Sequence, residues 1–435
     1  MRLTFAHDGA ELAVDIAERN LAGVARGPRR AEPPPLDELL ASALASPVGS
    51  APLVERVRPG DRVAVLFDDA TRPTPVGALF PLVVAELARA GVRESDVVPV
   101  YAPGLHRPPD PRSARKYGEA LFRNPRLVEH DHETSPLTFR GITSRGVPVF
   151  VNGVVDDVDF RMSIGHIVPH MDAGYGGGGK IVLPGISGKP SVEQNHAFMI
   201  AAGSRLGKLE GNPVREDMDE AGRLAGLDFI VNSVADADGR VAAIAAGDPI
   251  AAHRWGCRAK QDLLAYRMEA PVDVAVVFEP DGFLSRAMAA MLYADRAVRL
   301  GGSIVLVAPC RAGWADAASV GVRLTPEESL VTKSAAELAR IVANREIDAL
   351  RLATAIFDYR RTMLEKHVTL VSARYDRDET AAFGMDYAPD LATALGAALE
   401  RQGPEARVLF VPEPFRMLPV LPRLEGVVWR MSGEG

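Results

Sequence analysis

Short apolar runs alternate with helical patterns along the chain, starting with DRVAVLFDD at 61–69. Apolar side chains recur at helical spacing in VGALFPLVVAELARAGV at 76–92, and a second short apolar run, DVVPVYAPG, follows at 96–104. Strand, helix and strand in this order predict a βαβ unit and therefore a parallel sheet. Because ligands of parallel sheets bind at the carboxyl ends of the strands, the polar residues of DDATRP and GLHRP are expected to face one crevice.

A second alternation of the same kind begins at VDVAVVFEP, 272–280, and continues through the short apolar runs SIVLVAP, VTLVSA and VLFVP. The pattern therefore predicts an α/β protein of two domains, each with a largely parallel sheet flanked by helices, and an active site in the cleft between them. We place the first domain at 1–268 and the second at 269–412. The tail at 413–435 is a candidate to rejoin the first domain.

Composition narrows the class of protein without changing this fold. The 435 residues suffice for two or three domains, and a net charge of −7 without a basic tract argues against nucleic acid as a partner. No apolar run approaches the roughly 18 residues of a membrane span, and the charged N-terminus does not resemble an export signal. Two cysteines are too few for a disulfide framework, so we expect a cytoplasmic protein. With nucleic acid and membrane both disfavoured, we expect its ligand to be a small molecule.

Four of the nine histidines lie in segments punctuated by glycine and proline: His106, His166, His170 and His196. One such histidine alone is more often an ordinary solvated or hydrogen-bonded side chain, but four of them near one lysine favour a catalytic site. Arg72 follows the first strand, where its guanidinium suits a carboxylate or a phosphate. The alternative is that Arg72 pairs with an aspartate of its own turn.

The segment GYGGGGK at 174–180 matches the first seven positions of a phosphate-binding loop, yet the sequence argues against an ATPase. Ile181 stands where magnesium binding requires Ser or Thr, and a proline follows where a helix should begin. The run of glycines would still let the backbone approach a bulky ligand. It also leaves Lys180 accessible for covalent attachment or charge pairing.

Several longer strings, taken together, resemble the nickel-dependent lactate racemase family, of the catalytic LarA type. They are DDATRPTP, GLHRP, SRGVPVFVN, IGHIVPHMDAGYGGGGKIVLPGISG and EQNH, with AGDPIAAHR as a weaker match. They occur in the family's order and cover roughly residues 60–260. The resemblance implies two domains and a nickel pincer nucleotide, a pyridinium mononucleotide whose ring carbon and two sulfurs bind nickel.

The resemblance also implies a role for individual residues. Lys180 matches the lysine that is joined covalently to the cofactor, and His196 matches the protein ligand of nickel. His106 and His170 match the two acid/base histidines, and Arg72 matches the arginine that steadies the substrate. The residues expected against the nucleotide are Asp69, Thr71, Gly176, Gly177, Gly178 and Gly179.

The implied reaction is racemisation or epimerisation of a 2-hydroxy acid by reversible hydride transfer, with cofactor-making enzymes as partners of the protein. One departure concerns the substrate: in PDGFLSRAMA, Arg286 stands at a position where lactate-specific members carry glutamine, and Ala289 replaces a lysine. We therefore expect Arg286 to contact a 2-hydroxy acid other than lactate, unless it only faces solvent. Two further functions stay open, a hydride-transfer oxidoreductase or dehydratase, and a non-catalytic carrier of the nickel cofactor.

Overall fold

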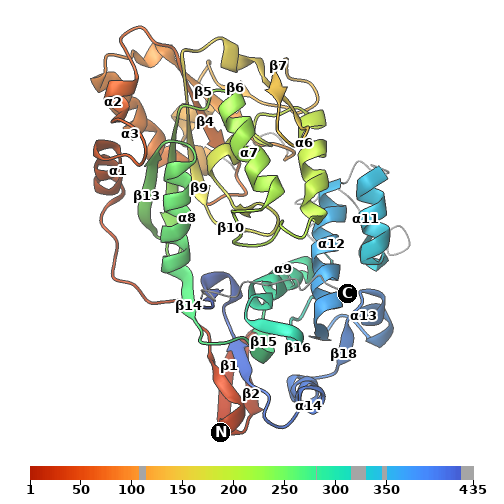
Figure 1. Cartoon of the computed structure of the whole chain (residues 1–435). Coiled ribbons are helices and arrows are strands. Elements are labelled where there is room, and N and C mark those ends of the chain that lie inside the picture. Colours follow the sequence, from red (N-terminus) through yellow and green to blue (C-terminus); the bar gives the residue numbers. More distant parts are fainter. Residues whose placement is uncertain (107–113, 281, 315–329, 345–349, 423–435) are drawn as a thin grey trace, which may run out of the picture. The chain divides into compact units, whose positions relative to one another are not determined.

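The computed structural model describes residues 1–106, 114–280, 282–314, 330–344 and 350–422 (Figure 1). The chain divides into two compact units: unit 1 comprises Met1–Pro28, Leu264–Glu327 and Tyr359–Gly435, and unit 2 comprises Arg29–Leu263 and Glu328–Asp358. Among the described residues, no helix combines the length and the apolar character that a membrane crossing requires. The domain limits expected from the sequence stay a prediction.

Unit 2 is built on a six-stranded sheet whose neighbouring strands follow the order β13-β12-β9-β4-β5-β6. The pairs from β12 to β6 are parallel, and β13 is added antiparallel at the edge as a hairpin with β12. The strands are β4 (Val63–Asp68), β5 (Val97–Ala102), β6 (Val128–Glu129), β9 (Phe160–Ile167), β12 (Phe229–Ala235) and β13 (Val241–Gly247).

The central strand β4 is buried on both faces, which is why its sequence is a continuous apolar run. Ala64 and Leu66 belong to one core cluster, whereas Val63, Val65 and Phe67 belong to the cluster on the opposite face. Helices α1 (Leu36–Ala45), α2 (Leu53–Arg56) and α3 (Val76–Arg89) contribute to the second cluster.

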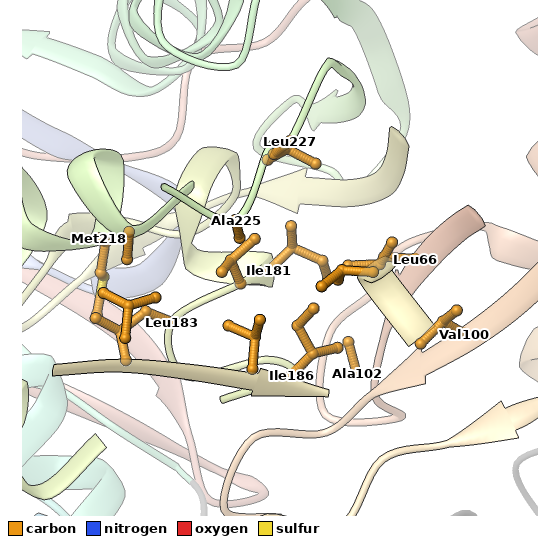
Figure 2. Close-up of a cluster of buried hydrophobic side chains, with 14 of the residues drawn as sticks. Leu66, Val100, Ala102, Ile181, Leu183, Ile186, Met218, Ala225 and Leu227 are labelled. Atoms are coloured by element: carbon orange, nitrogen blue, oxygen red, sulfur yellow. The ribbon is translucent and has the colours of Figure 1, made fainter. Parts of the chain in front are cut away.

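The first cluster joins the sheet to the segment that follows the glycine run. Figure 2 shows Leu66, Val100 and Ala102 in one cluster with Ile181, Leu183 and Ile186. Helix α7 (Pro213–Leu224) contributes Met218 to the same cluster, so the glycine run is held against the core immediately after it ends. The remaining elements of unit 2 are short strands and helices: α4 (Ala114–Tyr117), α5 (Glu119–Phe122), β7 (Leu137–Ile142), β8 (Pro148–Asn152), β10 (Pro169–His170), β11 (Gly174–Tyr175), α6 (Lys189–His196), α8 (Ala251–Leu264) and α11 (Ala335–Asn344).

Unit 1 contains a second six-stranded sheet, in the order β18-β17-β16-β15-β19-β3, in which every pair is parallel. The strands are β3 (Leu21–Val24), β15 (Val272–Phe278), β16 (Val298–Val307), β17 (His367–Val371), β18 (Asp386–Ala388) and β19 (Val408–Val411). Its other elements are β1 (Arg2–His7), β2 (Ala10–Asp15), β14 (Ala265–Arg267), α9 (Leu284–Asp295), α13 (Arg377–Ala382), α14 (Leu391–Gln402) and β20 (Leu418–Val420), while α12 (Leu350–Glu365) spans the division between the units. The predicted α/β class, with parallel-rich sheets flanked by helices, is confirmed.

Candidate active site

A pocket in unit 2 lies where the strand order of the sheet reverses. The chain runs from β4 outward to β5 and β6, and then returns to the other side of β4 with β9 and β12. Asp68 ends β4, Pro103 follows β5, and His166 lies near the end of β9; all three line the pocket. This is the position at which open parallel sheets bind their ligands, as the sequence predicted.

The pocket collects most of the residues singled out in the sequence. Its charged, polar and glycine lining residues are Asp68, Asp69, Arg72, His106, Gly165, His166, His170, Asp172, Gly176, Gly177, Gly178, Lys180, Gly185, His196 and Asn232. Two candidates, Thr71 and Gly179, are not among the lining residues, and Arg286 belongs to unit 1.

The turn after β4 is organised by two aspartates with separate partners. Asp68 Oδ2 accepts a hydrogen bond from Thr74 Oγ1 at 2.5 Å, and its Oδ1 pairs with Lys116 Nζ at 2.8 Å. Burial raises the pKa of Asp68, although Lys116 opposes that effect. The Arg72 side chain makes no hydrogen bond or ion pair with the residues that the structure describes, although its charge helps to lower the pKa of Asp69 in the same turn.

Asp69 orients His106 across the pocket. Its Oδ2 lies 2.6 Å from His106 Nδ1, and its Oδ1 accepts from the backbone N–H of Thr71 at 2.6 Å. Burial by itself favours the neutral acid, but these two hydrogen bonds hold the pKa of Asp69 well below its usual range. An ionised carboxylate only accepts hydrogen bonds, so His106 carries a proton on Nδ1 and a neutral ring keeps its lone pair on Nε2.

His170 is held in a different way. Its Nδ1 accepts the backbone N–H groups of Asp172 and Ala173, both at 3.3 Å. The same nitrogen lies 3.8 Å from Asp172 Oδ2. A neutral His170 therefore carries its proton on Nε2, and a carboxylate stands close enough to stabilise a charged ring.

Packing within the protein already requires glycine at three positions of this run, whether or not a ligand is bound. Gly178 has φ +60°, and a Cβ there would stand 2.8 Å from the ring of His253. A Cβ at Gly177 would lie 2.6 Å from Asn232 Oδ1, and one at Gly179 would lie 2.2 Å from the Met218 carbonyl oxygen. These contacts leave no room for a side chain at any of the three positions.

A buried arginine that was not part of any sequence motif donates hydrogen bonds to the backbone in and just before the glycine run. Arg215 of α7 is fully buried and donates to the carbonyl oxygens of Ala173, Tyr175 and Gly177. It also pairs with Asp219, which receives a second hydrogen bond from Arg254 Nη2 at 2.6 Å.

His253 of α8 supports the same run by binding the carbonyl oxygen of Gly176 through Nε2 at 2.8 Å. The weakly matching string AGDPIAAHR contained both His253 and Arg254, so one signal for this support was present in the sequence. Arg215 gave no comparable signal, because an arginine on a helix is usually exposed.

Lys180 and His196 reach the pocket from short helical segments. Lys180 belongs to a 3₁₀ turn, Gly178–Ile181, and His196 is the last residue of α6. No group of three or more histidine, cysteine, aspartate or glutamate side chains with metal-site geometry occurs in the described part of the chain.

Arg286, on α9 of unit 1, has partners in its own surroundings. Its Nε lies 3.4 Å from Glu279 Oε1, and its guanidinium carbon lies 4.4 Å from the centre of the Phe415 ring. Its expected contact with substrate stays a prediction.

Comparison with known proteins finds lactate racemases among those similar to this chain. Residues 7–207 match the family model of the lactate racemase N-terminal domain. A lactate racemase from Lactiplantibacillus plantarum is 29% identical over 395 residues, which cover 86% of this chain and 89% of that protein. A lactate racemase from Thermoanaerobacterium thermosaccharolyticum is 27% identical over 314 residues, covering 70% of this chain and 73% of that protein.

The solved structures agree on the fold. The lactate racemase apoprotein from T. thermosaccharolyticum superposes with a TM-score of 0.79 at 23% identity, covering 97% of this chain and all of that one. A protein from Thermotoga maritima superposes with a TM-score of 0.61 at 20% identity, covering 91% of this chain and all of that one. The chain is therefore similar to lactate racemases: its first half matches the model of their N-terminal domain, two curated relatives carry that name, and its fold is that of the lactate racemase apoprotein.

Proposed function

We propose that this protein is a racemase or epimerase of a 2-hydroxy acid and that it works with a nickel pincer nucleotide. One observation carries the proposal: a single pocket brings together Arg72, His106, His170, Lys180 and His196. Curated relatives of the chain are named lactate racemases, which supports the reaction class.

The residues of the pocket fit such a cofactor by their chemistry. The imidazole of His196 is a ligand type that suits nickel, and the described residues lack a complete metal site, so the remaining ligands would come from the nucleotide. The amine of Lys180 suits a covalent bond to it, and backbone from Gly176 to Gly178 forms a wall without side chains. When bound, the cofactor supplies an electrophilic ring carbon that accepts and returns the hydride of the substrate Cα.

Arg72 and His106 are suited to the first half of the reaction. The guanidinium of Arg72 makes no hydrogen bond or ion pair with the described residues, so it can bind the substrate carboxylate with two parallel hydrogen bonds. His106 Nε2 keeps a lone pair because Nδ1 donates to Asp69, so it can take the proton of the substrate hydroxyl. Asp69 then stabilises the imidazolium that forms.

His170 is suited to the second half, the return of a proton on the opposite side of the substrate. In its charged form His170 carries a proton on both ring nitrogens, Asp172 Oδ2 at 3.8 Å from Nδ1 can stabilise the charge, and Nε2 can donate to the substrate oxygen. The neutral ring left behind keeps its proton on Nδ1, in place of the two backbone N–H groups that Nδ1 accepts in this structure, so its Nε2 can take a proton when the opposite enantiomer reacts. Inversion at Cα requires such a pair of groups, because the hydride leaves one face of the carbon and returns to the other.

The experiment is to co-express the chain with the enzymes that make the cofactor and to incubate it with a panel of enantiopure 2-hydroxy acids, separating the products by chiral chromatography. We expect about one nickel ion per chain and racemisation or epimerisation of at least one acid. His106→Asn and His170→Asn should each abolish turnover in both directions while nickel stays bound. Retained turnover in either variant would contradict the assigned roles.

The same preparation separates the proposal from its alternatives. Substrate labelled with deuterium at Cα should invert while keeping much of the label, whereas a net oxidoreductase or a dehydratase would give a product of different composition. A carrier would bind nickel and convert no acid, and it would have no need of the Asp69–His106 pair. The Arg286→Gln variant tests substrate choice: a changed preference within the panel would support its contact with substrate, and an unchanged preference would count against it.

A further inference from the structure

A fourth imidazole in the pocket, His166, has no role in the proposed reaction. It lies near the end of β9 and is 3% exposed, yet it is one of the residues that line the pocket. In the parallel ladder His166 stands beside Ser233 of β12, and the two side chains are in contact.

The contact with Ser233 determines which nitrogen of His166 carries the proton. Ser233 Oγ donates its hydrogen to the carbonyl oxygen of Gly165 at 3.2 Å. A hydroxyl has only one hydrogen, so at its 2.9 Å contact with His166 Nδ1 the same oxygen must accept. His166 therefore carries its proton on Nδ1, and Nε2 has a lone pair.

The ring is also kept neutral. Burial, together with the nearby positive charges of Lys260, Arg72 and Lys116, lowers the pKa of His166 to about 3. At neutral pH Nε2 can only accept a hydrogen bond. It makes none with the residues that the structure describes, although its neighbours in the pocket include the donors Arg72 and Lys180.

We propose that His166 is a binding residue whose Nε2 accepts a hydrogen bond from a hydroxyl group of the molecule held in this pocket. Arg72 and Lys180 are cations and suit anionic groups, whereas His166 is a neutral acceptor and suits the part of the ligand that donates. A buried acceptor that meets no donor lowers affinity, so His166 also disfavours ligands without the hydroxyl.

The inference rests on the proposed function in one respect only, namely which ligands can supply the hydroxyl group. Two sources of a hydroxyl are compatible with it, the 2-hydroxy group of the substrate and the ribose of the mononucleotide. The Ser233 contact itself does not depend on the reaction.

The first test is the protonated nitrogen itself. Nitrogen-15 NMR of histidine-labelled protein should show one neutral ring protonated on Nδ1 between pH 5 and pH 8, and the signal that disappears in His166→Gln identifies it. In Ser233→Ala this ring should become a mixture of the two neutral tautomers. A ring protonated on Nε2 in the wild-type protein would overturn the proposal.

The second test is binding, measured by isothermal titration calorimetry with two matched pairs of probes. Nicotinic acid mononucleotide is compared with its 2′,3′-dideoxy analogue, and lactate is compared with propionate. For at least one pair the wild-type protein should prefer the hydroxylated probe, and His166→Leu should weaken that probe about tenfold without changing the affinity for its partner. His166→Gln, whose amide oxygen can accept in place of Nε2, should keep the preference.

The pair that responds identifies the source of the hydroxyl. A preference that survives in His166→Leu, or a wild-type protein without preference in either pair, would refute the inference. A protein that racemises an acid but shows no preference dependent on His166 would contradict this inference alone. A protein that shows the preference but converts no acid would contradict the proposed function alone.

Discussion

Arg215 offers the sharpest test of how the glycine run is held in place. Its side chain is fully buried and contacts three backbone carbonyl oxygens, of Ala173, Tyr175 and Gly177, and the carboxylate of Asp219. The substitution Arg215→Met keeps most of the volume of the side chain and removes all of its donors. The glycine run then loses its hydrogen bonds to α7.

The magnitude follows from what the substitution leaves behind. Removing one partner of a buried, hydrogen-bonded ion pair costs about 3–5 kcal/mol, because the remaining groups stay buried without compensation. Asp219 keeps its hydrogen bond from Arg254, so the larger part of the cost comes from the three carbonyl oxygens, at about 1 kcal/mol each, the lower end of the range for a buried group left without its partner. We expect the free energy of unfolding to fall by about 3–5 kcal/mol.

The assay combines urea unfolding, followed by circular dichroism, with hydrogen–deuterium exchange of the peptide covering 174–182. Exchange in that peptide should become faster in Arg215→Met than in the wild-type protein under native conditions. Arg223→Met is the matched control, since Arg223 lies on the same helix and is exposed. A loss of less than about 1 kcal/mol in Arg215→Met, with unchanged exchange at 174–182, would refute the assigned role.

Three further predictions concern the same unit. Gly178→Ala should cost about 1–3 kcal/mol in unfolding free energy, because its Cβ would meet the ring of His253, whereas Gly239→Ala, with a similar positive φ but nothing within 4 Å, should cost less. The pKa of Asp69 lies below its unfolded value of about 4, so its contribution to stability is complete above about pH 5 and is lost as the pH falls towards 2. Asp69→Asn should therefore flatten the pH dependence of unfolding in that window, and an unchanged slope would contradict the pairing. Intact-mass measurement after co-expression with the cofactor-making enzymes should show an adduct on the wild-type chain that Lys180→Arg lacks.

The strands and their order along the chain could be predicted from the sequence because a buried strand is a short continuous run of apolar residues. The run predicted at 61–69 contains β4, and the runs at 272–280 and 408–412 contain β15 and β19. Strands buried on both faces are continuously apolar, and this property needs no knowledge of distant residues. The N-terminal strand β3 was missed, since its four residues gain their place only by pairing with β19, far along the chain.

The sequence by itself determined the class of fold and which side chains end the strands of the first sheet. Only the tertiary structure decided how those side chains are held: Asp69 behind His106, backbone N–H groups on His170, Ser233 beside His166, and Arg215 behind the glycine run. The physical reason is that a short-range pattern reports burial and backbone conformation. Which nitrogen of a neutral imidazole carries the proton, by contrast, depends on a hydrogen-bond partner that can be distant in the sequence, and for His166 this partner lies 67 residues away.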